Sequence, residues 1–79
     1  MMNYIMVVKG YDVEYAMYGD ERESSWEITW VINDVPSLDK MKECVALEKD
    51  KYLDAHRHGP HLTSIEVYEI AKKVITERY

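Results

Sequence analysis

Residues 26–32 read WEITWVI, and this stretch decides the predicted fold. Its side chains alternate between an apolar set and a mixed set, with Trp26, Ile28, Trp30 and Ile32 in the first and Glu27, Thr29 and Val31 in the second. Strict alternation of aromatic and β-branched residues is typical of a strand with one buried face. We therefore expect a strand here, with Trp30 buried in the core against Met41 and Val45.

The residues before this strand predict its partner. Residues 11–18, YDVEYAMY, alternate in the same way, and residues 19–25, GDERESS, are polar and typical of a turn. Two alternating runs joined by such a segment predict a β-hairpin. Residues 3–8, NYIMVV, are apolar on both faces, and we expect them to continue the first strand through a bend at Gly10.

After Pro36 the apolar residues recur at helical spacing. Ser37 is a suitable N-cap, and Asp39 follows in the first turn, where the helix dipole favours an acid. The apolar stripe consists of Leu38, Met41, Val45 and Tyr52. This spacing predicts an amphipathic helix over residues 37–56.

The C-terminal segment fits two structures. Residues 64–70, SIEVYEI, are rich in β-branched and aromatic residues, which predicts a returning strand over about 64–71, followed by a short tail that could be helical. Thr63 and Glu66 also form a capping box, so a second helix is the alternative. The predicted fold class is α+β, with a small antiparallel sheet on one helix in ββαβ order. The alternative is a β-hairpin followed by two helices.

Length and composition indicate one folded domain spanning residues 1–79. Hydrophobic residues make up 47% of the chain and charged residues 32%, as expected for a folded protein. The single cysteine, Cys44, has no internal disulfide partner and is expected to pack as a small hydrophobic residue on the helix. The N-terminal residues resemble neither a signal peptide nor a membrane span, so the predicted location is cytoplasmic.

The net charge of −5 is unevenly distributed. Residues 1–36 hold seven acidic and two basic residues, whereas residues 37–79 hold eight of each. With no basic stripe to neutralise phosphates, we expect no direct binding to nucleic acid and no membrane binding. A basic protein, or a protein that itself binds nucleic acid, is the kind of partner that this charge favours.

All three histidines lie in residues 56–61, HRHGPH. His56 suits the last turn of the helix, and Gly59 with Pro60 forms a common stop signal, so the segment is interpreted first as a helix end. His56, His58 and His61 could alternatively hold a metal or a small molecule. Catalysis by one of these histidines is a further alternative. No nucleophile motif accompanies them, so we expect neither an enzyme nor a bound cofactor.

Seven tyrosines, two tryptophans and no phenylalanine give every aromatic side chain a polar atom, a composition enriched at interfaces. One helix covers only one face of a sheet, so we expect a second copy of the chain to cover the other. The predicted function is a homodimeric inhibitor or adaptor that binds a basic protein through an acidic, tyrosine-rich hairpin surface. The residues assigned to this surface are Tyr15, Tyr18, Asp20, Glu21, Glu23 and Glu27.

Overall fold

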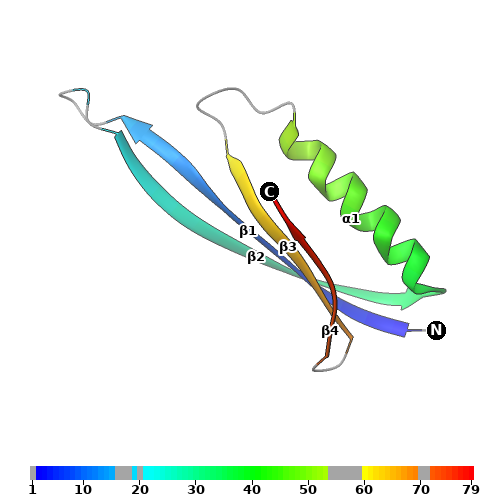
Figure 1. Ribbon diagram of the computed structural model, residues 1–79. Coiled ribbons are helices and arrows are strands. Elements are labelled where there is room, and N and C mark those ends of the chain that lie inside the picture. The colour runs from blue at the N-terminus through cyan, green and yellow to red at the C-terminus, as the bar shows by residue number, and fades with distance from the viewer. Residues whose placement is uncertain (1, 16–18, 20, 54–59, 70–71) are drawn as a thin grey trace.

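The computed structural model describes residues 2–15, 19, 21–53, 60–69 and 72–79. In chain order its elements are β1 (Met2–Tyr15), β2 (Glu21–Val35), α1 (Leu38–Leu53), β3 (His61–Glu69) and β4 (Lys72–Arg78) (Figure 1). The predicted α+β class and ββαβ order are therefore confirmed, with a further strand at the C-terminus. The alternative of a hairpin followed by two helices is wrong.

The four strands form one antiparallel sheet in the order β2-β1-β3-β4. Since β2 and β3 both run antiparallel to β1, they are parallel to each other, and α1 makes the crossover between them. β1 continues through Gly10 without a break, as predicted. Its pairing with β2 reaches Tyr15, but its pairing with β3 stops at Tyr11.

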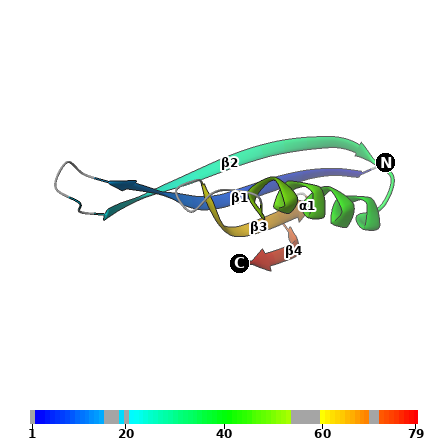
Figure 2. The same ribbon diagram turned by 90° about the horizontal axis from the view of Figure 1, so that it is seen from above.

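Beyond Tyr11 the sheet therefore narrows to two strands, which we call the arm (residues 12–15 and 21–24). The arm extends away from α1, and the molecule is elongated, with extents of 52 × 24 × 17 Å (Figure 2). We call the remainder of the sheet, together with α1, the body.

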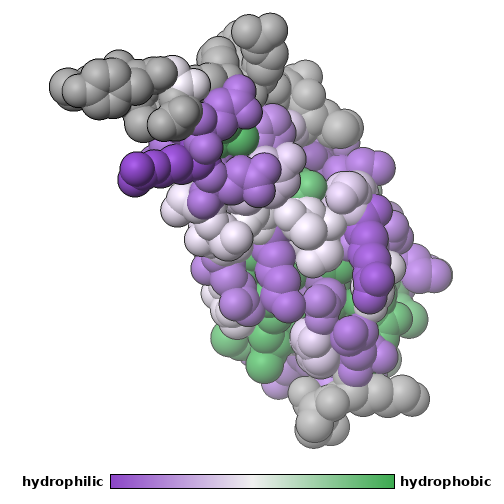
Figure 3. Space-filling model, turned by 60° about the vertical axis from the view of Figure 1, so that its left-hand side comes forward, coloured by the Kyte–Doolittle hydropathy of each residue, from purple (hydrophilic) through white to green (hydrophobic). Residues whose placement is uncertain are grey.

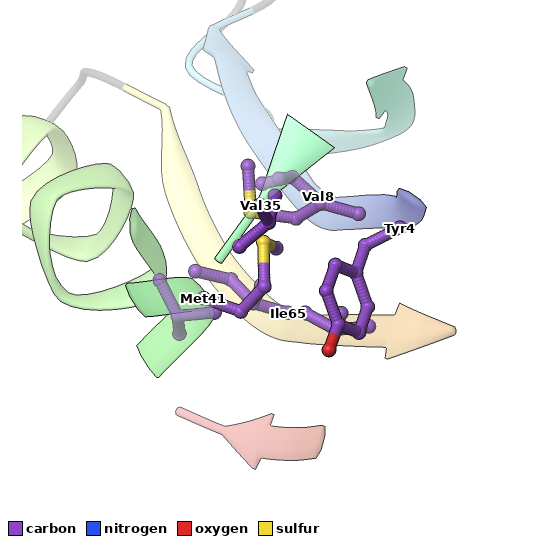
Figure 4. Close-up of a cluster of buried hydrophobic side chains, with 8 residues drawn as sticks. Tyr4, Val8, Val35, Met41 and Ile65 are labelled. Atoms are coloured by element: carbon purple, nitrogen blue, oxygen red, sulfur yellow. The ribbon is translucent and has the colours of Figure 1, made fainter. Parts of the chain in front are cut away.

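The core lies in the body, between α1 and one face of the sheet (Figure 4). Alternate residues of the two central strands point into it because successive strand side chains face opposite ways. The fully buried residues come from β1, α1 and β3 and are Tyr4, Val8, Met41, Ile65 and Val67. We call this side of the sheet the inner face and the opposite side the outer face.

The start of α1 follows the sequence prediction. The backbone N–H of Lys40 donates a hydrogen bond to Ser37 Oγ at 3.3 Å, which is the expected N-cap contact. Asp39 lies in the first turn. The predicted end of the helix, residues 54–56, and most of the HRHGPH segment lie outside the described residues.

The returning C-terminal strand is confirmed, and the segment differs from the prediction in two details. β3 begins at His61 rather than at residue 64, and the tail forms β4 rather than a helix. In β4, Ile75 pairs with Val67 and Thr76 pairs with Glu66. This pairing satisfies the backbone groups along the edge of β3, which a helical tail would leave open. Tertiary pairing thus overrides the local capping-box signal of Thr63 and Glu66.

The burial predicted for Trp30 is also wrong. Trp30 pairs with Met6 and so faces inward, but it is 46% exposed, and Ile28 beside it is 39% exposed. A helix is about 10 Å across, whereas strands are spaced about 4.8 Å apart, so one helix cannot cover four strands. The helix packs Met41 and Val45 into the core and leaves the inner face of β2 half open.

Candidate partner-binding surface

The arm is the first candidate surface, and its acidic residues come from both strands. Glu14 pairs with Arg22, and Glu23 pairs with Val13. Gly19 lies in the connection between the strands with a φ of 83°, a left-handed conformation that glycine adopts without strain. The side chains of Glu14, Glu21 and Glu23 are exposed.

Within the described ranges the arm holds four acidic residues, Asp12, Glu14, Glu21 and Glu23, and one basic residue, Arg22. The ion pairs of the described residues all lie in the body, and none includes a residue of the arm. The arm is therefore a concentrated negative surface, in which Arg22 is the one basic residue among those that the structure describes.

The structure brings together some of the predicted contact residues and separates others. Glu21 and Glu23 lie on the arm, and Tyr15 ends β1 at the same place. Glu27 lies in the body, where it pairs with Lys9 on the outer face. Tyr18 and Asp20 lie outside the described residues.

The free edge of β2 is a second exposed feature, and the sequence analysis missed it. β2 is the outermost strand on its side of the sheet, and three of its apolar residues, Ile28, Trp30 and Val31, are 39%, 46% and 67% exposed. In Figure 3, which brings the left-hand side of Figure 1 forward, hydrophobic residues show mainly in the lower part of the face and hydrophilic residues cover most of the upper part. Because strand order cannot be read from alternation alone, the sequence did not reveal which strand would lie at the edge.

An aromatic cluster lies at the base of the arm, around Gly10. A Cβ atom at Gly10 would collide with the Trp26 indole and with the carbonyl oxygen of His61. The indole of Trp26 also stacks on Tyr52 of α1, with ring centroids 5.5 Å apart and an interplanar angle of 23°. Trp26 is thus held between the sheet backbone and the end of the helix.

A pocket of about 280 Å³ lies beside this cluster, lined by Tyr11, Lys49, Tyr52, His61, Leu62 and Tyr79. The His61 ring stacks on Tyr11 at a centroid distance of 4.9 Å, and Lys49 Nζ lies 5.0 Å from the centre of the Tyr79 ring. In both contacts, residues that line the pocket pack against an aromatic ring of a neighbouring lining residue. Of the predicted metal-binding residues, His61 is therefore an aromatic neighbour of Tyr11, and His56 and His58 lie outside the described residues.

The outer face carries a charged cluster centred on Glu66, which the sequence analysis also missed. Glu66 Oε2 accepts a hydrogen bond from the Tyr68 hydroxyl at 2.5 Å and lies 3.3 Å from Lys73 Nζ, and Glu66 Oε1 accepts a hydrogen bond from Lys9 Nζ at 3.4 Å. The Glu66 side chain is only 14% exposed. The hydrogen bond from Tyr68 and the two lysines lower the pKa of Glu66 from 4.5 to about 2, against the opposing effect of burial. The same hydrogen bond raises the pKa of Tyr68.

The Glu66 cluster is internally satisfied, which favours a structural role in joining β1, β3 and β4. Among the described residues, no group of three or more His, Cys, Asp or Glu side chains is placed to hold a metal ion. Cys44 is half-buried on α1 and packs against the core, as predicted. In the described part of the chain, no helix has the length and apolar character needed to cross a membrane.

Comparison with known proteins found no family model, no curated protein and no solved structure that matches this chain. The function is therefore argued from the surfaces described above.

Proposed function

We propose that this protein is a non-enzymatic interaction module that binds a basic surface of another protein through its acidic arm. One observation supports this most directly. The arm projects beyond the body, and its carboxylates have no cationic partner among the described residues other than the single Arg22 beside them. Such a surface is complementary to clustered lysine and arginine side chains.

The electrostatics of the free protein favour this kind of partner. Like charges brought together on a narrow hairpin repel one another, and that repulsion is least screened at low ionic strength. A basic partner removes the repulsion on binding and is also attracted from a distance by the same field. Proteins that bind nucleic acid carry basic surfaces of this kind, and an acidic arm that covers one would act as an inhibitor or as an adaptor.

The backbone of the arm adds a second means of recognition. Pairing of β1 with β3 ends at Tyr11, so no described strand pairs with the β3 side of residues 12–15 or with the opposite side of residues 21–24 of β2. Free strand edges offer N–H and C=O groups to an extended partner segment. Carboxylates would thus select a basic partner, and the backbone would position it.

The test is a charge reversal on the arm with a matched reversal on the body. Tagged protein is used to isolate partners from the cells that produce it, and each identified partner is purified for kinetic measurements. Glu21→Lys with Glu23→Lys should lower the association rate about tenfold or more, because rim charges act mainly on encounter. The rate for the unchanged protein should also fall as salt rises.

The control carries the same change of charge elsewhere. Asp50→Lys with Glu77→Lys alters two exposed acids of the body and should change the association rate little. Circular dichroism should show the same fold for both double variants. The proposal is wrong if the purified partner binds both variants at equal rates, or if its association rate is indifferent to salt.

A further inference from the structure

We propose that two copies of this chain associate through the free edge of β2, pairing antiparallel along residues 28–32 to join two four-stranded sheets into one. This inference concerns a different surface from the acidic arm and does not depend on it. It also differs from the expected packing of a second copy over the outer face, because the sheets meet edge to edge.

The distribution of charge singles out this edge. A sheet edge is a template for pairing unless charged residues, prolines or bulges protect it. The other edge, β4, is protected because four of its seven residues are charged: Lys72, Lys73, Glu77 and Arg78. The first part of β2 is protected by Glu21, Glu23 and Glu27, whereas residues 28–33, ITWVIN, carry no charge.

The neutral stretch also ends at a structural boundary. Between the pairs Tyr4–Ile32 and Met2–Val35, β2 has one more residue than β1, which is a β-bulge. Asp34 there adopts a φ of 59°, and its N–H donates a hydrogen bond to Asn3 Oδ1 at 3.1 Å. Regular pairing along this edge is therefore limited to the residues between Glu27 and the bulge.

The exposed side chains determine how a second copy would align. A two-fold axis perpendicular to the sheet keeps inner faces on the same side, so even-numbered residues of β2 meet even-numbered ones. With the axis at Trp30, the Trp30 side chains of the two copies meet each other, and Ile28 meets Ile32. On the outer face Thr29 meets Val31. Aromatic and β-branched pairs of this kind stabilise antiparallel strands.

Other alignments are less favourable. Moving the axis to Thr29 places Val31 opposite Glu27, and moving it to Glu27 places the two Glu27 carboxylates opposite each other. With the axis at Trp30, Glu27 meets the polar Asn33. Residues 21–23 then extend past the partner's β2, so both acidic arms stay free, at opposite ends of the dimer.

The test uses two double variants of the same exposed pair. Thr29→Lys with Val31→Lys places lysines opposite lysines across the proposed interface, whereas Thr29→Lys with Val31→Glu places opposite charges there. Five paired residues in each copy make a smaller interface than the standard size, so we expect dissociation in the micromolar range for the unchanged chain. The lysine pair should weaken dimerisation about tenfold or more, and the lysine–glutamate pair should stay within about threefold of the unchanged protein.

Sedimentation equilibrium over a dilution series measures the dissociation constant of each full-length variant. Hydrogen exchange gives an independent readout, because those amides of residues 28–32 that point away from β1 should become more protected as protein concentration rises. Circular dichroism shows whether each variant folds. Ile5→Lys is the control: Ile5 is 38% exposed on the outer face of β1, one strand in from the edge, and takes no part in the proposed pairing, so its replacement should leave dimerisation unchanged.

Three results would overturn the inference. One is a monomeric mass at every concentration up to about tenfold above the micromolar dissociation constant that is expected for so small an interface. A second is loss of the dimer in Ile5→Lys but not in the two-lysine variant, which would indicate stacking of outer faces. The third is growth beyond a dimer, which would indicate pairing of β2 with β4 of the next copy. Reversal of Glu21 and Glu23 should not alter the dimer, so failure of this inference is distinguishable from failure of the proposed arm function.

Discussion

Gly10 illustrates at the scale of a residue how a missing side chain shapes the base of the arm. The Trp26 indole and the His61 carbonyl oxygen occupy the space that a Cβ atom would need. The carbonyl belongs to the backbone and cannot move aside without disturbing the pairing of β1 with β3. The substitution therefore forces a shift of either the indole or the strand.

We expect Gly10→Ala to lower the free energy of unfolding by about 1–3 kcal/mol, as is usual for overpacking in a close-packed site. Urea unfolding followed by circular dichroism measures the change. Gly19→Asn is the control, because Gly19 has open space around it and asparagine tolerates its left-handed φ of 83°. If Gly10→Ala is as stable as the unchanged protein, the close packing of Trp26 on the sheet is refuted.

Glu66 makes the free energy of unfolding depend on pH. Its pKa is lowered to about 2 in the folded protein, chiefly by the hydrogen bond from Tyr68. Ionised Glu66 is therefore more stable in the folded protein than in the unfolded chain. This stabilisation is complete above the ordinary pKa of 4.5 and disappears as pH falls towards 2.

We expect Glu66→Gln to cost about 1–2 kcal/mol at neutral pH, the usual range for charge-assisted hydrogen bonds with partly exposed partners. The stability of the variant should also fall less than that of the unchanged protein as pH drops below 4.5. Urea unfolding at a series of pH values measures both effects. Glu77→Gln, at an exposed position on β4, should keep the full decline, and equal pH profiles for the two variants would contradict the assignment.

At the scale of the element, the packing of α1 on the sheet buries one large apolar residue and leaves another half-exposed. Met41 is fully buried, whereas Trp30 is 46% exposed although it faces the same side. Met41→Ala should cost about 2–5 kcal/mol, the usual range for a buried methionine. Trp30→Ala should cost less than about 2 kcal/mol, because much of the indole already contacts water.

Thermal and urea unfolding of the two variants, measured below the concentration at which the chain self-associates, gives the comparison. The order of the two costs is the diagnostic result. A larger loss for Trp30→Ala than for Met41→Ala would mean that the helix covers β2 more fully than described here.

At the scale of the whole molecule, one sheet has parts of unequal stability. In the body, residues 5–8 of β1 pair with strands on both sides, whereas the arm has only two strands. Isolated two-stranded hairpins are marginally stable in water, and the acidic residues of the arm repel one another. The arm therefore depends on the body for its order.

We expect backbone amides of residues 12–14 and 22–24 to exchange with solvent at least about tenfold faster than those of residues 6–8. Hydrogen exchange followed by nuclear magnetic resonance compares both regions of β1 in one sample. Added salt should narrow the difference, because it screens repulsion within the arm. Equal protection along the whole of β1 would show that the arm is stabilised by contacts other than its two-stranded pairing.

Local patterns in the sequence were sufficient for much of this architecture. Period-two alternation in residues 11–18 and 26–32 predicted the hairpin, since successive strand residues face opposite sides whatever the surroundings. Ser37 and Asp39 predicted the helix start, because capping depends on neighbours within a few residues. The acidic character of the arm also follows from the sequence, since Glu21 and Glu23 lie close together in the chain.

The tertiary structure alone decided which strands lie at the edges and what each face contacts. Trp30 is half-exposed because β2 is an outer strand. Residues 72–78 form a strand because their backbone pairs with the edge of β3. The Glu66 cluster joins Lys9 and Lys73, which are far apart in the chain. Local propensity carries no information on such pairings, because their free energy arises only when distant segments of the chain meet.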